Sequence, residues 1–188
     1  MKILAIESSC DETAAAIVEN GTKVLSSIIS SSADLHQQTG GVIPEIAARE
    51  QLKYIIPVIK QAFINSRLAQ NDINAIAVTY GPGLIGSLLV GVETAKTLAY
   101  AWNKPLVPVN HLVGHLYANW INDNNVQLTM TNDQCPINND QCPIPNIQTP
   151  CIKYQVPTFP ALAMVISGGH TDLILMKGHG KLAYLCGS

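Results

Sequence analysis

Hydrophobic residues near the N-terminus fall in short runs that are typical of β-strands. Three such runs cover residues 2–8, 13–19 and 23–31. The last two are separated by Asn20-Gly21, and Asn-Gly between apolar runs is the strongest short-range signal for a β-hairpin. We therefore predict a three-stranded meander, in which the loop after the first strand carries Ser8, Ser9, Cys10, Asp11 and Glu12.

The hydrophobic period then lengthens to that of a helix. Apolar residues recur at intervals of three and four between residues 44 and 65, which predicts an amphipathic helix. Pro44 suits the first turn of this helix. Pro57 lies in its interior, where a proline should kink the helix or begin a second one.

The next segment alternates between strand and helix. A buried strand is predicted over residues 74–79, a helix over 86–102 and a further strand over 106–109. Strands that alternate with helices in this way predict an α/β lobe.

Residues 122–157 interrupt this pattern. They are rich in Asn, Gln, Thr and Pro and contain the tandem repeat Asn-Asp-Gln-Cys-Pro-Ile at 132–137 and 139–144. A proline in each copy excludes a coiled coil, so we interpret the segment as a surface insertion that is largely disordered. The alternative is a thiolate metal site, although the spacing of its cysteines is unlike that of a CxxC pair. Its ligands would be Cys135, Cys142 and Cys151.

A β-type pattern returns near the C-terminus. It predicts strands over residues 161–166 and 171–176, with a Ser-Gly-Gly turn at 167–169, and the beginning of a third strand over 181–185. No helix follows in the sequence to cover this hairpin, and an uncovered hairpin leaves apolar surface in water. We therefore expect the chain to be truncated.

The composition indicates a well-buried globular chain. Of the 188 residues, 47% are hydrophobic and 13% are charged, and the formal net charge is −2. This balance gives no strong electrostatic footprint for nucleic acid, although a local basic patch or a partner protein can supply the attraction. No signal peptide and no apolar stretch of membrane-spanning length is visible. The five cysteines are an odd number at irregular spacing, so we expect a cytoplasmic protein with reduced thiols.

Two histidines, His111 and His115, directly follow the strand predicted at 106–109. On a helix, residues four positions apart project from the same face. Two imidazoles placed in this way can share one metal ion. The alternative is a pair of partly exposed helix histidines, because the sequence shows no obvious third ligand.

Two glycine-rich loops and one acidic loop carry further candidate chemistry. Residues 81–87 follow a strand and lead into a helix, where backbone amides can bind an anion, or they form only a tight turn. Residues 167–171 let a ligand approach the backbone, or they form an ordinary hairpin turn. Asp11 and Glu12 could bind a metal or act as a general base, or they form a solvated turn. Glu7 lies in an otherwise apolar strand, so it needs a partner if it is buried.

Together these segments resemble the TsaD family, the tRNA N6-adenosine threonylcarbamoyltransferases formerly called glycoproteases, in its bacterial branch. The similarity covers the chain except for the Asn-rich insertion, and its motifs occur in family order. They are IESSCDET at 6–13, GGVIPE at 40–45, YGPGL at 80–84, the His111/His115 pair and VISGGHT at 165–171.

This resemblance implies the actin/sugar-kinase/Hsp70-like (ASKHA) fold, an α/β fold with two similar lobes around a ligand cleft. Residues 1–110 are then the first lobe, and residues 111–188 are the start of a truncated second lobe that contains the insertion at 122–157. The implied reaction transfers a threonylcarbamoyl group from threonylcarbamoyl-AMP to N6 of adenosine 37 in tRNAs that read codons beginning with A. The implied partner proteins are of the TsaB type and the TsaE type.

The resemblance also assigns roles to residues. His111 and His115 match the two metal histidines of the family, which hold one divalent ion, usually iron or zinc. Asp11 and Glu12 match acids at the active cleft, and Asp11 is the candidate general base. The donor is a mixed anhydride, so the protein must chiefly supply position and charge stabilisation while the adenine amine attacks and AMP leaves. A substrate-binding segment is matched by Val165, Ile166, Ser167, Gly168, Gly169 and His170.

The chain also departs from the family pattern. Family members are considerably longer, and their third metal ligand, an aspartate near the C-terminus, has no counterpart here. One alternative is therefore a non-catalytic scaffold or remnant of the same fold, like TsaB, although TsaB-type chains lack the histidine pair. Another is an ATP-dependent kinase or phosphatase of the same fold class, in which the histidine pair has no role.

Overall fold

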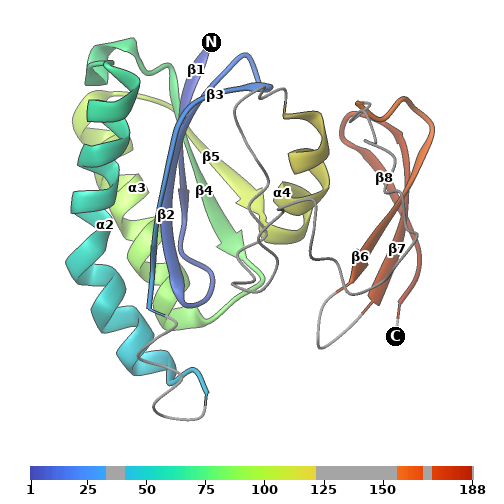
Figure 1. Cartoon of the computed structure of the whole chain (residues 1–188), viewed down its shortest axis with the longest axis horizontal. Coiled ribbons are helices and arrows are strands. Elements are labelled where there is room, and N and C mark those ends of the chain that lie inside the picture. Colours follow the sequence, from blue (N-terminus) through green and yellow to red (C-terminus); the bar gives the residue numbers. More distant parts are fainter. Residues whose placement is uncertain (33–40, 122–155, 167–170, 188) are drawn as a thin grey trace, which may run out of the picture.

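The computed structural model of the chain describes residues 1–32, 41–121, 156–166 and 171–187 (Figure 1). Residues 122–155, which include both copies of the repeat, and the Ser-Gly-Gly turn lie outside the described residues. The disorder and the thiolate metal site that we weighed for the insertion therefore stay predictions.

The N-terminal meander forms as predicted. The strands β1 (Lys2–Glu7), β2 (Glu12–Glu19) and β3 (Lys23–Ser31) pair antiparallel in succession. Asn20 and Gly21 have φ angles of 53° and 78°. A tight hairpin turn uses this left-handed backbone, which Gly and Asn adopt more readily than other residues.

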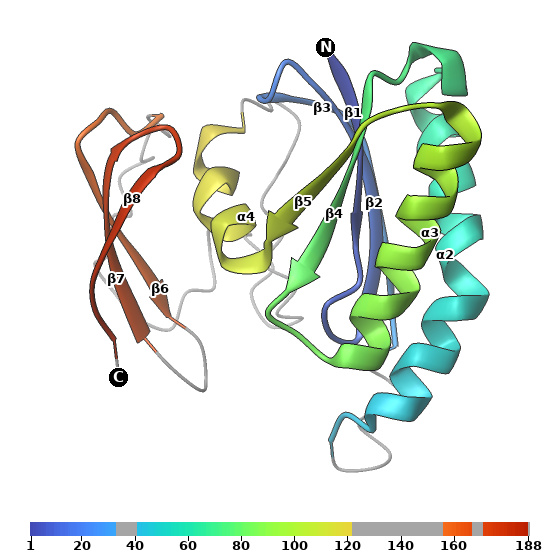
Figure 2. The ribbon, with the colours of Figure 1, turned by 180° about the vertical axis from the view of Figure 1, so that it is seen from behind.

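Two parallel strands complete the first sheet. β4 (Ala75–Gly81) pairs with β1, and β5 (Leu106–Asn110) pairs with β4, so that the strand order is β3-β2-β1-β4-β5. The helices α2 (Pro44–Ser66) and α3 (Ile85–Trp102) cover one face of this sheet (Figures 1 and 2). The predicted α/β lobe is confirmed. Since β1, β4 and β5 run parallel, their C-terminal ends meet at one edge of the sheet, where α/β folds bind ligands.

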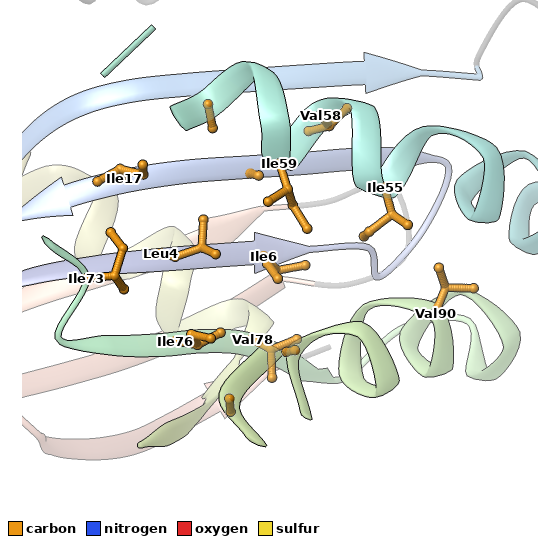
Figure 3. Close-up of a cluster of buried hydrophobic side chains, with 14 residues drawn as sticks. Leu4, Ile6, Ile17, Ile55, Val58, Ile59, Ile73, Ile76, Val78 and Val90 are labelled. Atoms are coloured by element: carbon orange, nitrogen blue, oxygen red, sulfur yellow. The ribbon is translucent and has the colours of Figure 1, made fainter. Parts of the chain in front are cut away.

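The core of this lobe lies between the sheet and the two helices (Figure 3). Leu4 and Ile6 of β1 are buried at alternate positions, because successive side chains of a strand point to opposite faces. They pack in one cluster with Ile76 of β4 and with Ile55 and Ile59 of α2. Full burial of side chains of this size stabilises the fold by roughly 1.5–3 kcal/mol each.

One expectation for α2 was too strong. The helix is continuous through Pro57, so the second helix that we considered does not begin there. Proline removes one backbone hydrogen bond from a helix interior. The neighbouring Ile55, Val58 and Ile59 are all buried in the core, and this packing holds the helix together across the proline.

The C-terminal part forms a second sheet. β6 (Ala161–Ile166), β7 (Thr171–Gly178) and β8 (Lys181–Gly187) pair antiparallel in chain order, which confirms the strands predicted there. The short helix α4 (His111–Tyr117) follows β5 directly and lies between the two sheets (Figures 1 and 2).

α4 packs against this second sheet through a second hydrophobic cluster. Leu116 of α4 and Trp120 of the 3-10 turn η2 (Ala118–Trp120) pack with Ile174 and Met176 of β7. The other 3-10 turn, η1 (Gln70–Asp72), precedes β4. Within the described ranges, we find no helix with the length and apolar character needed to cross a bilayer.

Candidate metal centre and ligand cavity

A cavity of about 850 Å³ opens between the edge of the first sheet and β6. This volume is in the range of small-molecule sites. Its walls include the β1–β2 loop, the loop before α3, α4 and β6, and residues of η2 and β7 contribute as well. Among the residues that line it are Ser9, Cys10, Gly83, His111, His115, Val165 and Ile166.

His111 and His115 meet at one wall of this cavity. α4 begins at His111 because Asn110 caps it: the side-chain oxygen of Asn110 accepts hydrogen bonds from the backbone N–H groups of Leu112 (2.9 Å) and Val113 (3.3 Å). The helical spacing then brings the two Nε2 atoms to 3.0 Å from each other. At this separation both Nε2 atoms could bind the same ion. The predicted convergence of the pair is therefore confirmed.

The other ring nitrogen of His111 faces the first sheet. Its Nδ1 lies 3.4 Å from Oε2 of Glu7 and 3.2 Å from Oγ of Ser9. A histidine that ligates a metal through one nitrogen usually directs the other at a carboxylate or carbonyl oxygen. The contacts of Nδ1 therefore fit a metal-binding His111, and they also fit a histidine that is only part of the helix surface.

Glu7 is held in place from two further directions. The backbone N–H of Ser9 donates to Oε1 of Glu7 at 2.6 Å, and the hydroxyl of Thr79 donates to Oε2. Burial acts to raise the pKa of Glu7, but the hydrogen bonds from Ser9 and Thr79 outweigh it and lower the pKa below the ordinary value. Glu7 is thus an ionised acceptor at neutral pH, and it has the partners that its place in an apolar strand required.

Two other ionisable side chains near the cavity have shifted pKa values. Burial, together with the neighbouring charge of His111, lowers the pKa of His115. This favours the neutral imidazole, the form that binds metals. Burial and the nearby Asp11 raise the pKa of the Cys10 thiol, so Cys10 is a poor nucleophile at neutral pH.

The acidic loop is fixed by its backbone. The buried Gln51 of α2 donates from Nε2 to the carbonyl oxygens of Cys10 (2.7 Å) and Glu12 (3.2 Å). The hydroxyl of Ser32 donates to the carbonyl of Asp11 at 2.7 Å. Asp11 is half-buried and Glu12 is exposed. Within the described residues, Ser9 and Cys10 line the cavity but Asp11 and Glu12 do not, so the catalytic role of these acids stays a prediction.

The loop before α3 is packed against the β1–β2 loop. The backbone N–H of Leu84 donates to the carbonyl of Ser9 at 2.7 Å. A Cβ atom on Gly83 would overlap this carbonyl oxygen and lie 2.7 Å from Ser9 Cβ. Gly83 is therefore required for close packing, which is the first of the two interpretations of this loop. The first-turn amides of α3, which have no partner within the helix, leave the anion-binding interpretation open.

The predicted substrate segment is described only in part. Val165 and Ile166 end β6 and line the cavity. Ser167, Gly168, Gly169 and His170 lie outside the described residues, so their role stays a prediction.

The described parts of the chain contain no group of three His, Cys, Asp or Glu side chains that could hold a metal ion. Three polar residues around His111 were not predicted as part of the site, namely Glu7, Ser9 and Thr79. Glu7 gave a signal as a charge in an apolar strand, whereas Thr79 gave none, because a threonine at the end of a strand is common.

Comparisons with known proteins agree with the motifs. Residues 23–131 match the family described as "TsaD: tRNA N6-adenosine threonylcarbamoyltransferase". A protein of that name from Thermomicrobium roseum is 50% identical over 185 residues, which cover 98% of this chain and 44% of the relative. One from Bacillus subtilis is 44% identical over 181 residues, which cover 96% of this chain and 43% of the relative. The chain thus spans about half the length of the curated relatives it matches.

A solved structure shares the fold. It is described as an uncharacterized protein from Pseudomonas aeruginosa with similarity to the peptidase YeaZ. The likeness has a TM-score of 0.51 at 14% sequence identity and covers 98% of this chain and 63% of that one. At this identity the likeness concerns the fold alone, and it agrees with the mixed α/β architecture described above.

Proposed function

This chain belongs to the TsaD family of tRNA N6-adenosine threonylcarbamoyltransferases, and we propose that it carries part of the active site of such an enzyme. The proposed reaction transfers the threonylcarbamoyl group of threonylcarbamoyl-AMP to N6 of adenosine 37. The tRNAs are those that read codons beginning with A. The observation that carries the proposal is the convergence of His111 and His115, with 3.0 Å between their Nε2 atoms, on a cavity of ligand size. A merely structural pair of histidines needs neither the convergence nor the cavity.

We propose that the pair holds one divalent ion, iron or zinc, because neutral imidazole suits both metals. The Nε2 atoms of His111 and His115 would be the ligands from this chain. When bound, such an ion supplies Lewis-acid stabilisation and a template for the threonyl group. Two imidazoles are an incomplete ligand set, so the remaining positions fall to groups outside the described residues or to the substrate.

The residues of the chain have separate tasks in this proposal. In the reaction, the new bond joins N6 of the adenine to the carbamoyl carbon, the bond from that carbon to the phosphate oxygen breaks, and AMP leaves with the electron pair. We propose that backbone amides of the glycine loop before α3 hold the phosphate. Val165 and Ile166 form one wall for the substrate. We assign the role of general base to Asp11, which lies next to Glu12 in the loop between β1 and β2.

The second candidate is a non-catalytic scaffold or remnant of the same fold. The observation that favours it is that the described residues bring together only two metal-binding side chains. The kinase or phosphatase alternative gives no role to His111 and His115, which the structure places at the cavity wall, so it ranks last.

The boundary between the lobes belongs to this proposal as well. We place it between residues 110 and 111. The supporting observation is that Leu116 and Trp120, just after the boundary, pack with β7 of the second sheet and not with the first core. We propose a cytoplasmic location, in keeping with a tRNA substrate.

Transfer to tRNA is tested directly with nucleoside analysis. The purified chain is mixed with TsaB-type and TsaE-type proteins, threonylcarbamoyl-AMP and a tRNA that carries A37, and digested tRNA is examined by mass spectrometry. We expect threonylcarbamoyladenosine from this tRNA and none from a tRNA with G37. The Bacillus subtilis relative serves as the positive control. If only the relative modifies the tRNA, the scaffold is the better description of this chain.

We propose TsaB-type and TsaE-type proteins as partners, and the surface that supports a TsaB-type partner is an apolar groove between α2 and α3. Leu52 and Ile56 of α2 and Leu89 of α3 line it, and they are 63%, 44% and 54% exposed. Large apolar side chains gathered on one exposed face commonly mark a protein interface.

A charge placed in this groove should weaken binding of the TsaB-type protein. We expect Leu89→Glu to reduce the affinity at least tenfold, because burying an unpaired carboxylate costs more than about 1.4 kcal/mol. Ile29→Glu, which places the same charge on the exposed edge strand β3, is the matched control. Isothermal titration calorimetry gives both affinities, and an equal loss in the two variants would rule out the groove.

A further inference from the structure

Glu7 lies where β1, β4 and the beginning of α4 converge. Glu7 is the last residue of β1. Its carboxylate accepts hydrogen bonds from the Ser9 backbone N–H (2.6 Å) and the Thr79 hydroxyl, and it lies 3.4 Å from Nδ1 of His111. Thr79 comes from β4 and His111 follows β5. Glu7 is a charged residue in a strand whose residues Leu4 and Ile6 are buried in the core. Packing of the core does not require a charge at this position.

The hydrogen-bonding chemistry of Glu7 fixes the proton on His111. An ionised carboxylate can only accept hydrogen bonds. The Nδ1 atom that faces it is therefore the protonated nitrogen. Ser9 Oγ, 3.2 Å from the same Nδ1, can accept or donate, so it tolerates this proton. A neutral imidazole protonated at Nδ1 has its lone pair at Nε2, the atom that lies 3.0 Å from Nε2 of His115.

We propose that Glu7 is a positioning residue, which holds His111 in its Nδ1-protonated tautomer and in a fixed ring orientation so that Nε2 is free to bind the metal ion. This inference rests on the proposed function, since it concerns the same histidine pair. It predicts that Glu7 acts on metal binding through His111, without touching the ion itself.

The Glu7→Gln variant separates this role from simple packing. The Ser9 backbone N–H donates to Oε1, so it fixes the amide with its oxygen toward Ser9 and its NH₂ group toward Thr79 and His111. An NH₂ group can only donate. Nδ1 of His111 must then carry the lone pair, and the proton moves to Nε2. Size and shape are nearly unchanged, while the tautomer is reversed.

The tautomer is read from nitrogen-15 NMR of the imidazoles in metal-free protein, with the His111 signal assigned by its loss in His111→Asn. We expect Nδ1–H in the wild-type chain and Nε2–H in Glu7→Gln. Zinc affinity, measured by competition with a chromophoric chelator, should fall 10- to 100-fold in Glu7→Gln, the usual effect of losing such a partner.

The control is Ser26→Ala. Ser26 is buried on β3 and donates to the carbonyl of Ala62 at 2.8 Å, at the far side of the sheet from α4, so this variant loses a buried hydrogen bond of the fold without touching the pair. It should keep both the tautomer and the zinc affinity of the wild type. A wild-type His111 protonated at Nε2 overturns the proposal without any variant, and so does a Glu7→Gln chain that binds zinc within twofold of wild type.

The two proposals fail in different ways. A wild-type chain that binds no zinc contradicts the metal site of the proposed function. The tautomer of His111 is measured in metal-free protein. It therefore tests the proposed role of Glu7 whether or not the chain binds zinc.

Discussion

The double substitution His111→Ala/His115→Ala is expected to abolish binding of iron or zinc by this chain. The two Nε2 atoms lie 3.0 Å apart at the cavity wall, and the described residues offer no group of three ligands elsewhere. Removing both imidazoles leaves the ion with no protein ligand that the structure identifies. We expect the metal content, measured by inductively coupled plasma mass spectrometry after purification, to fall from about one ion per chain to background, in line with one shared ion per ligand pair.

The matched control removes a different imidazole. His179 is exposed and stacks near Tyr117, with ring centroids 5.7 Å apart, so His179→Gln deletes a histidine without touching the pair. Its metal content should equal that of the wild type. Circular dichroism of all variants checks that α4 and the sheets remain folded. Equal metal content in the wild type and the double variant would contradict the metal centre.

The second large effect is expected from Gly83→Ala, a single methyl group. A Cβ at this position would overlap the carbonyl oxygen of Ser9, so the loop before α3 must move away from the β1–β2 loop. This breaks the 2.7 Å hydrogen bond from Leu84 to Ser9. Overpacking costs about 1–3 kcal/mol and an unmade buried hydrogen bond costs about 1–3 kcal/mol. We therefore expect the free energy of unfolding to drop by about 2–6 kcal/mol.

Gly114→Ala is the same chemical change in an open place. The added Cβ would have no heavy atom within 4 Å among the described residues, and residue 114 lies inside α4. Replacing a helix-interior glycine by alanine should raise the free energy of unfolding by about 0.5–1 kcal/mol. Urea unfolding of both variants gives the two values. A Gly83→Ala chain as stable as the wild type would show that the two loops are not closely packed.

Much of the fold was predictable because its signals are local. The meander follows from the short apolar runs of β1 and β2 and from Asn20-Gly21 between β2 and β3, and each of these signals lies within a few neighbouring residues. The pairing of Nε2 atoms followed from the helical spacing of His111 and His115. Pro57 shows the limit, since its local preference allowed a second helix to begin there, whereas α2 packs on the sheet as one continuous helix.

The amino-acid sequence by itself determined the elements, the α/β class, the family and the histidine pair, because periodicity and motif order are properties of the chain before it folds. Only the tertiary structure decided which groups surround that pair. Glu7 stands 104 residues before His111 and 72 before Thr79, and no local pattern links them. They meet because β1, β4 and β5 run parallel, which brings the ends of three strands to the same edge of the sheet.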